Sequence, residues 1–160
     1  MMADEHRYRL RTVWTGAARG PTADYARYSR EYTVEIDGKP ILTGSADPAF
    51  LGDPTLANPE DWLLAALSAC HMLSYLAIAA RSRIAVLSYR DDATATMVTT
   101  QGGGQFSEAI LRPAVVIADA GHLERAVQLH DLAHKQCFIA NSVNFPVRHL
   151  PEVGAGDATA

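Results

Sequence analysis

The sequence is poor in cysteine, since only Cys70 and Cys137 occur among its 160 residues. Small secreted proteins stabilised by disulfides carry many more, so that class is excluded, and in a reducing compartment both thiols are expected to be free at rest. Positive charge is scarce as well, with a formal net charge of −4 and a pI of about 5.8. Proteins that bind the nucleic-acid backbone present a cationic surface, so no nucleic-acid partner is expected.

The first residues, Met1 to Arg7, carry charges where a secretory leader has its apolar segment. We therefore expect no signal peptide and a cytoplasmic location. Hydrophobic residues make up 48% of the chain and charged residues 20%, which excludes disorder throughout. A chain of this length can bury about two-thirds of its surface, which predicts a single domain over residues 1–160.

There is only one long hydrophobic run. From Trp62 to Ala80 the clearly polar residues are Ser68, His71 and Ser74, and the run approaches the roughly 20 residues that span a bilayer. Its polar side chains would have no obvious partners in lipid, so we expect no membrane. A helix that is apolar all round is typical of a protein core. Because this short chain has little material to surround such a helix, the pattern indicates a partner subunit.

Alternation of polar and apolar residues, helix-start signals and turn residues predict an α+β chain. Asn58 suits the N-cap of a helix, Pro59 its first position and Glu60 the positive end of its dipole. Pro113, within a predicted return strand, favours a sheet edge or a bulge. The expected order is N-terminal strands and a loop (6–57), a central helix (58–82), strands (84–119), a second helix (121–137) and a loose tail (152–160).

The second predicted helix carries His130, His134 and Cys137 at spacings of four and three residues, which places them on one face. Such a face can bind Zn²⁺ when a fourth ligand such as His71 or Cys70 completes the set. The other interpretation is that both histidines are half-buried and form hydrogen bonds with their neighbours. The position of Cys137 in the last turn, without a second close ligand pair, favours the second interpretation.

Two segments together carry a family resemblance. The first runs from Asn58 to His71 (NPEDWLLAALSACH) and the second from Ala133 to Ser142 (AHKQCFIANS). An Asn-Pro-Glu helix start, a cysteine ten residues after the glutamate and a later cysteine after a helix resemble the OsmC/Ohr family, the osmotically inducible and organic hydroperoxide resistance proteins. The resemblance extends from about Tyr8 to Pro151. It implies an OsmC-like α+β fold with antiparallel sheets around a long buried central helix, and an intertwined homodimer.

The resemblance also implies thiol-dependent reduction of organic hydroperoxides. Cys70 corresponds to the peroxidatic cysteine, whose thiolate attacks the O–O bond and becomes a sulfenic acid. Cys137 corresponds to the resolving cysteine, which forms a disulfide with Cys70. A dithiol, of the lipoyl type in the family, then reopens the disulfide by exchange. Because sulfur itself changes oxidation state, no metal or organic cofactor is expected.

This chemistry needs a positive group near Cys70. The thiolate is the reactive form, and Cys70 lies in mid-helix among apolar residues, too far from the helix start for the dipole to help. In the family an arginine fills this role, held by the glutamate that corresponds to Glu60. Glu60 and Cys70 would lie about 15 Å apart along a straight helix. Glu60 would therefore act through the arginine, across a subunit interface or after a break in the helix.

Three arginines compete for that role. The family places its arginine either in a loop after the first strand or shortly before the Asn-Pro-Glu segment, and this chain has no arginine between Glu31 and Glu60. Arg19 fits the first location, Arg30 ranks level with it, and Arg27 ranks behind both. His71 corresponds to nothing in the family's chemistry, and we expect it to be a packed or interfacial side chain.

Three functional hypotheses follow. The first is a hydroperoxide reductase whose partners are a second copy of the chain, an organic hydroperoxide and a dithiol. The second is a non-catalytic binder of a small molecule, or of a metal held by His130, His134 and Cys137, on the same scaffold. The third is a dimeric protein that binds a lipid-like ligand.

Overall fold

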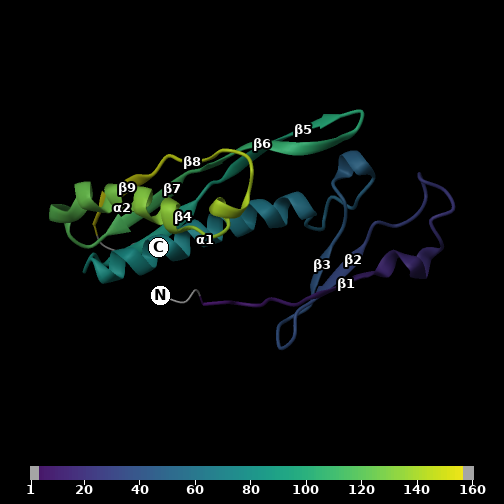
Figure 1. The fold of residues 1–160 in the computed structure, drawn as a ribbon, viewed down its shortest axis with the longest axis horizontal. Helices are drawn as coiled ribbons and strands as arrows, with labels where there is room; N and C mark the ends of the chain where they lie inside the picture. Colours follow the sequence, from purple (N-terminus) through teal and green to yellow (C-terminus); the bar gives the residue numbers. More distant parts are fainter. Residues whose placement is uncertain (1–3, 157–160) are drawn as a thin grey trace. The chain divides into compact units, whose positions relative to one another are not determined.

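A computed structural model describes residues 4–156 of the chain (Figure 1). The contacts form two compact units, one that ends at Trp62 and one that begins at Leu63, and the single domain expected from the sequence stays a prediction. The division falls inside the long helix α1 (Pro59–Arg81), so the first turn of this helix belongs to the N-terminal unit and the rest to the C-terminal unit.

The N-terminal unit is built on a three-stranded antiparallel sheet in the order β1-β2-β3. Its strands are β1 (Arg11–Trp14), β2 (Tyr32–Glu35) and β3 (Leu42–Gly44). Gly38, in the turn between β2 and β3, has a φ of 71°, a left-handed conformation that glycine adopts without steric cost. The loops also form two 3-10 segments that the sequence did not predict, η1 (Thr15–Arg19) and η2 (Pro48–Phe50).

The start of α1 is fixed by reciprocal capping. The Asn58 side-chain oxygen accepts a hydrogen bond from the Asp61 backbone N–H at 2.8 Å, and an Asp61 carboxylate oxygen accepts one from the Asn58 N–H at 3.1 Å. Each side chain therefore satisfies a backbone donor at the helix start. Asp61 completes this capping box, and neighbouring Glu60 adds negative charge to the first turn.

The C-terminal unit contains two three-stranded sheets, ordered β4-β7-β9 and β5-β6-β8. The pairs β4–β7 and β5–β6 are antiparallel, as expected, while the pairs β6–β8 and β7–β9 are parallel. The reason is that the chain returns through α2 (Leu123–Gln136) before its last strands join the sheets, and a crossover of this kind allows parallel pairing. The strands are β4 (Val86–Asp91), β5 (Thr94–Thr100), β6 (Gly103–Leu111), β7 (Pro113–Ile117), β8 (Val147–His149) and β9 (Glu152–Ala155).

Two local expectations are corrected. Residues 152–155, predicted as part of a loose tail, form β9 on the edge of a sheet, while residues 157–160 of that predicted tail lie outside the described residues. Pro113 lies in β7, the middle strand of its sheet, and not at an edge. It is tolerated because it is the first residue of that strand, directly after β6 ends.

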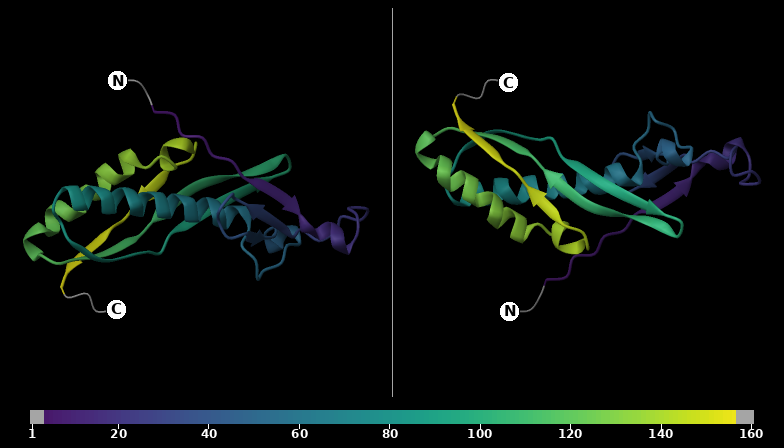
Figure 2. Two further views of the ribbon diagram at one scale, coloured as in Figure 1. Left: turned by 90° about the horizontal axis from the view of Figure 1, so that it is seen from below. Right: turned by 90° about the horizontal axis from the view of Figure 1, so that it is seen from above.

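The core of the C-terminal unit lies between α1, α2 and the β4-β7-β9 sheet. α2 lies beside the part of α1 that belongs to this unit (Figures 1 and 2). The core cluster consists of Tyr75, Ile78, Ala79, Ile84, Val115, Ile117, Ala126, Leu129 and Ala133.

The sequence predicted a central helix buried on every side, and the single chain covers only part of it. α1 buries one stripe, formed by Leu67, His71, Tyr75, Ile78 and Ala79, while Leu73 keeps 62% of its surface exposed. By length and composition α1 is also apolar enough to cross a membrane, but its buried stripe is part of the core of the C-terminal unit.

Candidate active site

The structure brings Cys70 and Cys137 together. Cys70 lies in the middle of α1 and is partly exposed, whereas Cys137 is buried at the end of α2, and both are free thiols. Burial is the largest cause that raises the pKa of the Cys137 thiol to about 11, and the neighbouring Cys70 side chain contributes to the same shift. The two thiols therefore lie close together, although the residues are far apart in the sequence.

Cys137 is held by the backbone geometry at the end of α2. It leaves the helix in an extended conformation, and its N–H donates to the His134 carbonyl at 3.2 Å. The chain then turns back, so that the Ala140 N–H points at the Cys137 Sγ at 3.5 Å and the Asn141 N–H donates to the Cys137 carbonyl at 3.0 Å. These contacts fix the thiol on a short and well-bonded loop.

Cys70 opens onto a groove of about 750 Å³, which we call the thiol groove. One wall is a single stripe of α1 in which Cys70, Ser74, Ala77 and Arg81 follow one another at helical spacing. The other wall comes from the end of α2 and the loop after it, where Phe138 is 80% exposed. The lining residues are Ala66, Ala69, Cys70, Leu73, Ser74, Ala77, Arg81, Lys135, Gln136, Phe138 and Asn141.

Two cations of the thiol groove, Arg81 and Lys135, were not among the predicted site residues. Arg81 lies in the last turn of α1, and Lys135 lies in the last turn of α2. The position of Arg81 three turns after Cys70 on one helix face could have suggested a shared surface. The position of Lys135 depends on how α2 packs beside α1, for which the sequence carries no local signal.

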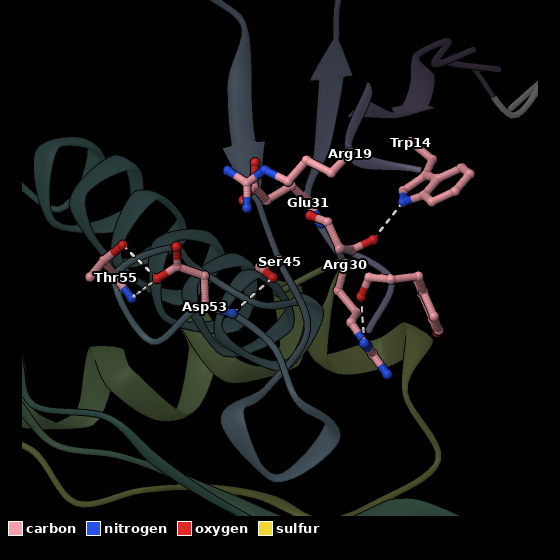
Figure 3. Close-up of polar contacts among 9 residues, drawn as sticks. Trp14, Arg19, Arg30, Glu31, Ser45, Asp53 and Thr55 are labelled. Atoms are coloured by element: carbon pink, nitrogen blue, oxygen red, sulfur yellow. Dashed lines mark hydrogen bonds and ion pairs between the residues drawn. The ribbon is translucent and has the colours of Figure 1, made fainter. Parts of the chain in front are cut away.

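The predicted arginines all lie in the N-terminal unit and interact with its own residues, as Figure 3 shows for Arg19 and Arg30. Arg19 forms an ion pair with Glu31 at 2.8 Å. Arg30 donates to the backbone carbonyls of Tyr25 and Tyr28, and its guanidinium lies 3.8 Å from the centre of the Tyr28 ring. Arg27 pairs with Asp24 on the surface at 3.1 Å.

Glu60 is partly buried in the first turn of α1, and its carboxylate forms no hydrogen bond or ion pair with the residues that the structure describes. It lies in the N-terminal unit, as do Arg19, Arg27 and Arg30, whereas the two cysteines lie in the C-terminal unit. A role of any of these four residues at Cys70 stays a prediction.

Four of the six histidines of the sequence gather in the core of the C-terminal unit. We call His71, His130, His134 and His149 the histidine array. His71 and His130 are fully buried, and their rings stack with the His71 Nε2 3.1 Å from the His130 Nδ1. His149 contacts the rings of both His71 and His134, and its Nε2 lies 3.0 Å from the exposed carboxylate of Asp131. Tyr75 stacks on His130 at 3.9 Å.

His71, His130 and His134 are held in the neutral form at ordinary pH because their surroundings disfavour charge. Burial, followed by the charges of neighbouring histidines, lowers the pKa of His71 to about 4 and that of His130 to about 3, and lowers the pKa of His134 as well. Several buried polar atoms of the array and its tyrosines have no partner among the described residues: His71 Nδ1, His130 Nε2, His134 Nδ1, Tyr75 OH and Tyr89 OH.

The predicted metal alternative finds no support in this arrangement. The described part of the chain holds no group of three His, Cys, Asp or Glu side chains placed to bind a metal ion. His130 Nδ1 faces His71 and His134 packs on His149, so both rings are engaged with other histidines. His71 is a packed side chain, as the sequence predicted, whereas His149 and Tyr89 were not predicted to join it.

The comparisons with known proteins agree on one family. The sequence pattern described as OsmC-like protein matches residues 52–149. An OsmC-like protein of unknown function from Vibrio cholerae is 34% identical, with a TM-score of 0.83 over 92% of this chain and 100% of that chain. An organic hydroperoxide resistance protein OsmC from Legionella pneumophila is 17% identical, with a TM-score of 0.69 over 95% of this chain and 99% of that chain.

Another structure, an organic hydroperoxide resistance protein from Elizabethkingia anophelis, is 19% identical, with a TM-score of 0.67 over 96% of this chain and 100% of that chain. Both hydroperoxide resistance proteins share the fold at low identity. A search of curated proteins finds no match. The family pattern covers more than half of the chain, and the similarity to the Vibrio protein extends over nearly all of it. The chain therefore has the OsmC-like α+β fold and belongs to the OsmC/Ohr family.

Proposed function

We propose that this protein is a thiol-dependent peroxidase that reduces organic hydroperoxides to alcohols through Cys70 and Cys137. The observation that carries the proposal is that these two free thiols lie close together where Cys70 opens onto the thiol groove. Membership of a family that includes organic hydroperoxide resistance proteins supports it. The groove has the size of a small-molecule site, and its apolar side chains suit an alkyl or aryl group.

In the first step the thiolate of Cys70 attacks the terminal oxygen of the hydroperoxide. The S–O bond forms as the O–O bond breaks, and the departing alkoxide takes a proton to become the alcohol. The sulfur is oxidised by two electrons to a sulfenic acid. Leu73 and Phe138, both exposed at the groove, would hold the organic part of the substrate and exclude water from the reacting oxygen.

In the second step Cys137 attacks the Cys70 sulfenic acid. The S–S bond forms as the S–O bond breaks, and the departing hydroxide takes the Cys137 proton and leaves as water. The raised pKa keeps Cys137 in the thiol form at neutral pH, so it does not compete with Cys70 for peroxide. An external dithiol then reduces the disulfide by two exchange reactions.

The same proposal includes a homodimer in the cytoplasm, where dithiol reductants are available. α1 leaves apolar side chains uncovered in the C-terminal unit, with Leu73 62% exposed, and Phe138 is 80% exposed beside it on the thiol groove. A second copy of the chain would remove such side chains from water. It would also supply the cover that a long apolar helix needs.

The direct test is to mix the reduced protein with cumene hydroperoxide and follow thiols, alcohol and mass. Wild type should consume one equivalent and form one Cys70–Cys137 disulfide per chain. Cys70→Ser should abolish the reaction, and Cys137→Ser should stop after one turnover with a sulfenic acid that dimedone traps. Two intact thiols after hours with excess hydroperoxide would overturn the proposal and leave ligand binding in the groove as the alternative.

The assisting arginine can be assigned by the pH dependence of Cys70 alkylation. Arg19→Ala, Arg30→Ala and Arg27→Ala would each be compared with wild type. Removal of the partner of the Cys70 thiolate should move the alkylation profile towards higher pH, because a nearby cation stabilises the charged form. Unchanged profiles in all three variants would remove these arginines from the mechanism.

A further inference from the structure

We propose that His71 and His130 are positioning residues for the second step: their hydrogen bond fixes α1 against α2 and so sets how fast Cys137 closes on an oxidised Cys70. This inference rests on the proposed function, since it concerns the disulfide that the proposed cycle forms. It concerns a different part of the molecule, because the pair lies in the core and does not line the thiol groove.

The position of the pair in the chain is the first argument. Cys70 and His71 are consecutive on α1, so their side chains point about 100° apart around the helix axis. Cys70 faces the groove while His71 faces the core. On α2, His130 lies on the stripe that leads to Cys137, and the Cys137 N–H is bonded to the carbonyl of His134 in the last turn. Each histidine is therefore rigidly connected to one of the two thiols through a helix backbone.

The nature of the contact is the second argument. His71 Nε2 and His130 Nδ1, 3.1 Å apart, form a buried side-chain hydrogen bond that joins α1 to α2. The other residues that these helices contribute to the core cluster are apolar apart from Tyr75, and they include Ile78 of α1 and Ala126 of α2. Apolar packing tolerates small sliding, whereas a buried hydrogen bond is directional and weakens steeply when its geometry is lost. The pair therefore fixes the register of the two helices.

The remaining nitrogens of the pair strengthen the argument. His71 Nδ1 and His130 Nε2 are buried without partners, so no competing hydrogen bond within the described residues can turn either ring away. Tyr75 holds His130 from the other side by ring stacking at 3.9 Å. A buried polar pair with two unpartnered atoms is costly compared with an apolar pair of the same size. Such a cost is expected where the position of the groups matters to function.

The charge state of the pair follows from what faces it on every element. The facing groups are Tyr75 on α1, His134 and Asp131 on α2, Tyr89 on β4 and His149 on β8. Burial keeps the pKa of His71 at about 4 and that of His130 at about 3, and raises the pKa of Tyr75 to about 12. Between pH 5 and 9 both histidines are therefore neutral. One ring N–H donates to the other ring, and the hydrogen bond between them is intact.

The test separates the two steps by stopped-flow kinetics with cumene hydroperoxide. His71→Leu removes the hydrogen bond, while His71→Gln can place its amide N–H where Nε2 was and keep it. We expect His71→Leu to oxidise Cys70 within about twofold of the wild-type rate. Disulfide formation should slow about tenfold, which corresponds to about 1.4 kcal/mol, and the trapped sulfenic acid should increase. His71→Gln should recover disulfide formation to within about threefold of wild type.

Two variants of His130 repeat the test in case a His71 variant does not fold. His130→Leu removes the other partner of the bond, whereas His130→Asn places its side-chain amide where Nδ1 was. His122→Gln is an exposed control on the same part of the chain. Three results would each overturn the inference. They are an equal fall in the rates of both steps, an unchanged rate of disulfide formation in the Leu variants, and a rate that the Gln and Asn variants do not restore.

Failure of the proposed function is distinguished by a measurement without hydroperoxide. The equilibrium constant of the Cys70–Cys137 disulfide is determined against reduced and oxidised dithiothreitol. If wild type ignores hydroperoxide but the Leu variants still weaken this disulfide about tenfold and the amide variants restore it, the positioning role stands without the peroxidase. If the equilibrium constant is unchanged in every variant, the positioning role is wrong.

Discussion

The histidine array makes the stability of the fold sensitive to mild acid. In the unfolded chain a histidine has a pKa of about 6.5, whereas in the fold the pKa of His71 is lowered to about 4 and that of His130 to about 3. Between these values the unfolded state binds more protons than the folded state. The free energy of unfolding therefore rises with pH in this window and falls as the pH drops below 6.5.

The size of the effect follows from proton linkage. On going from pH 7 to pH 5, one histidine that stays neutral in the fold and becomes protonated when unfolded costs about 2 kcal/mol of unfolding free energy. His71 and His130 are both fully buried, so screening by solvent is small. Part of each lowered pKa arises from the other histidines, which limits the sum for the pair to between about 2 and 4 kcal/mol. That is a large share of the 5–15 kcal/mol typical of a domain.

Urea unfolding followed by far-UV circular dichroism at pH 7, 6 and 5 measures this loss on the reduced protein. This range avoids most carboxylate titration. His71→Gln removes one titrating group, so its loss from pH 7 to pH 5 should be smaller than that of wild type by about 2 kcal/mol. His122→Gln, at an exposed histidine, should behave as wild type. The reasoning is refuted if His71→Gln and wild type lose the same free energy, or if wild type is more stable at pH 5 than at pH 7.

Two further predictions concern the thiols and the core. At pH 8 iodoacetamide should label the partly exposed Cys70 at least a hundredfold faster than Cys137. The reason is that a buried thiol with a pKa of about 11 is ionised in only about one molecule in a thousand at this pH. Comparable labelling of both cysteines, measured by peptide mass, would contradict this prediction. Leu129→Ala should lower the free energy of unfolding by about 3 kcal/mol, since Leu129 is 1% exposed in the core. Leu132→Ala, at a 38% exposed position of the same helix, should lower it by less than about 1 kcal/mol, and equal losses in urea unfolding would argue against the packing.

Local chemistry explains which parts of the fold could be predicted. Asn58, Pro59 and the acids that follow them mark a helix start through contacts within one turn, and α1 begins at Pro59. Alternation of polar and apolar residues before the helix predicted strands where β1 to β3 lie, since this alternation depends only on which face of a strand is solvated. The parallel partners of β6 and β7 could not be predicted in this way. β8 and β9 pair with strands that lie across α2 in the sequence, and no local pattern encodes that choice.

The same limit of local sequence patterns applies to the candidate site. The pairing of Cys70 with Cys137 came from the resemblance of two segments to a family, because spacing alone cannot bring two distant cysteines together. Helical spacing correctly placed His130 on the inner face of α2, but the same spacing also suggested a metal site that the described geometry does not contain. His149 was missed since it reaches the array only through the parallel pairing of β8 with β6.

The long helix α1 connects these observations. Its sequence is apolar on all sides, yet the fold of one chain buries only one stripe of the helix. The polar residues within the apolar run have different roles. Ser68 donates to the carboxylate of Asp91 and ties the helix to β4, while Ser74 lines the thiol groove. His71 lies between them in sequence and is buried against His130. Because a leucine at position 71 would pack in such a core without an unpartnered nitrogen, the histidine is best explained by the direction of its hydrogen bond. The rate of disulfide formation in His71→Leu measures what that direction contributes.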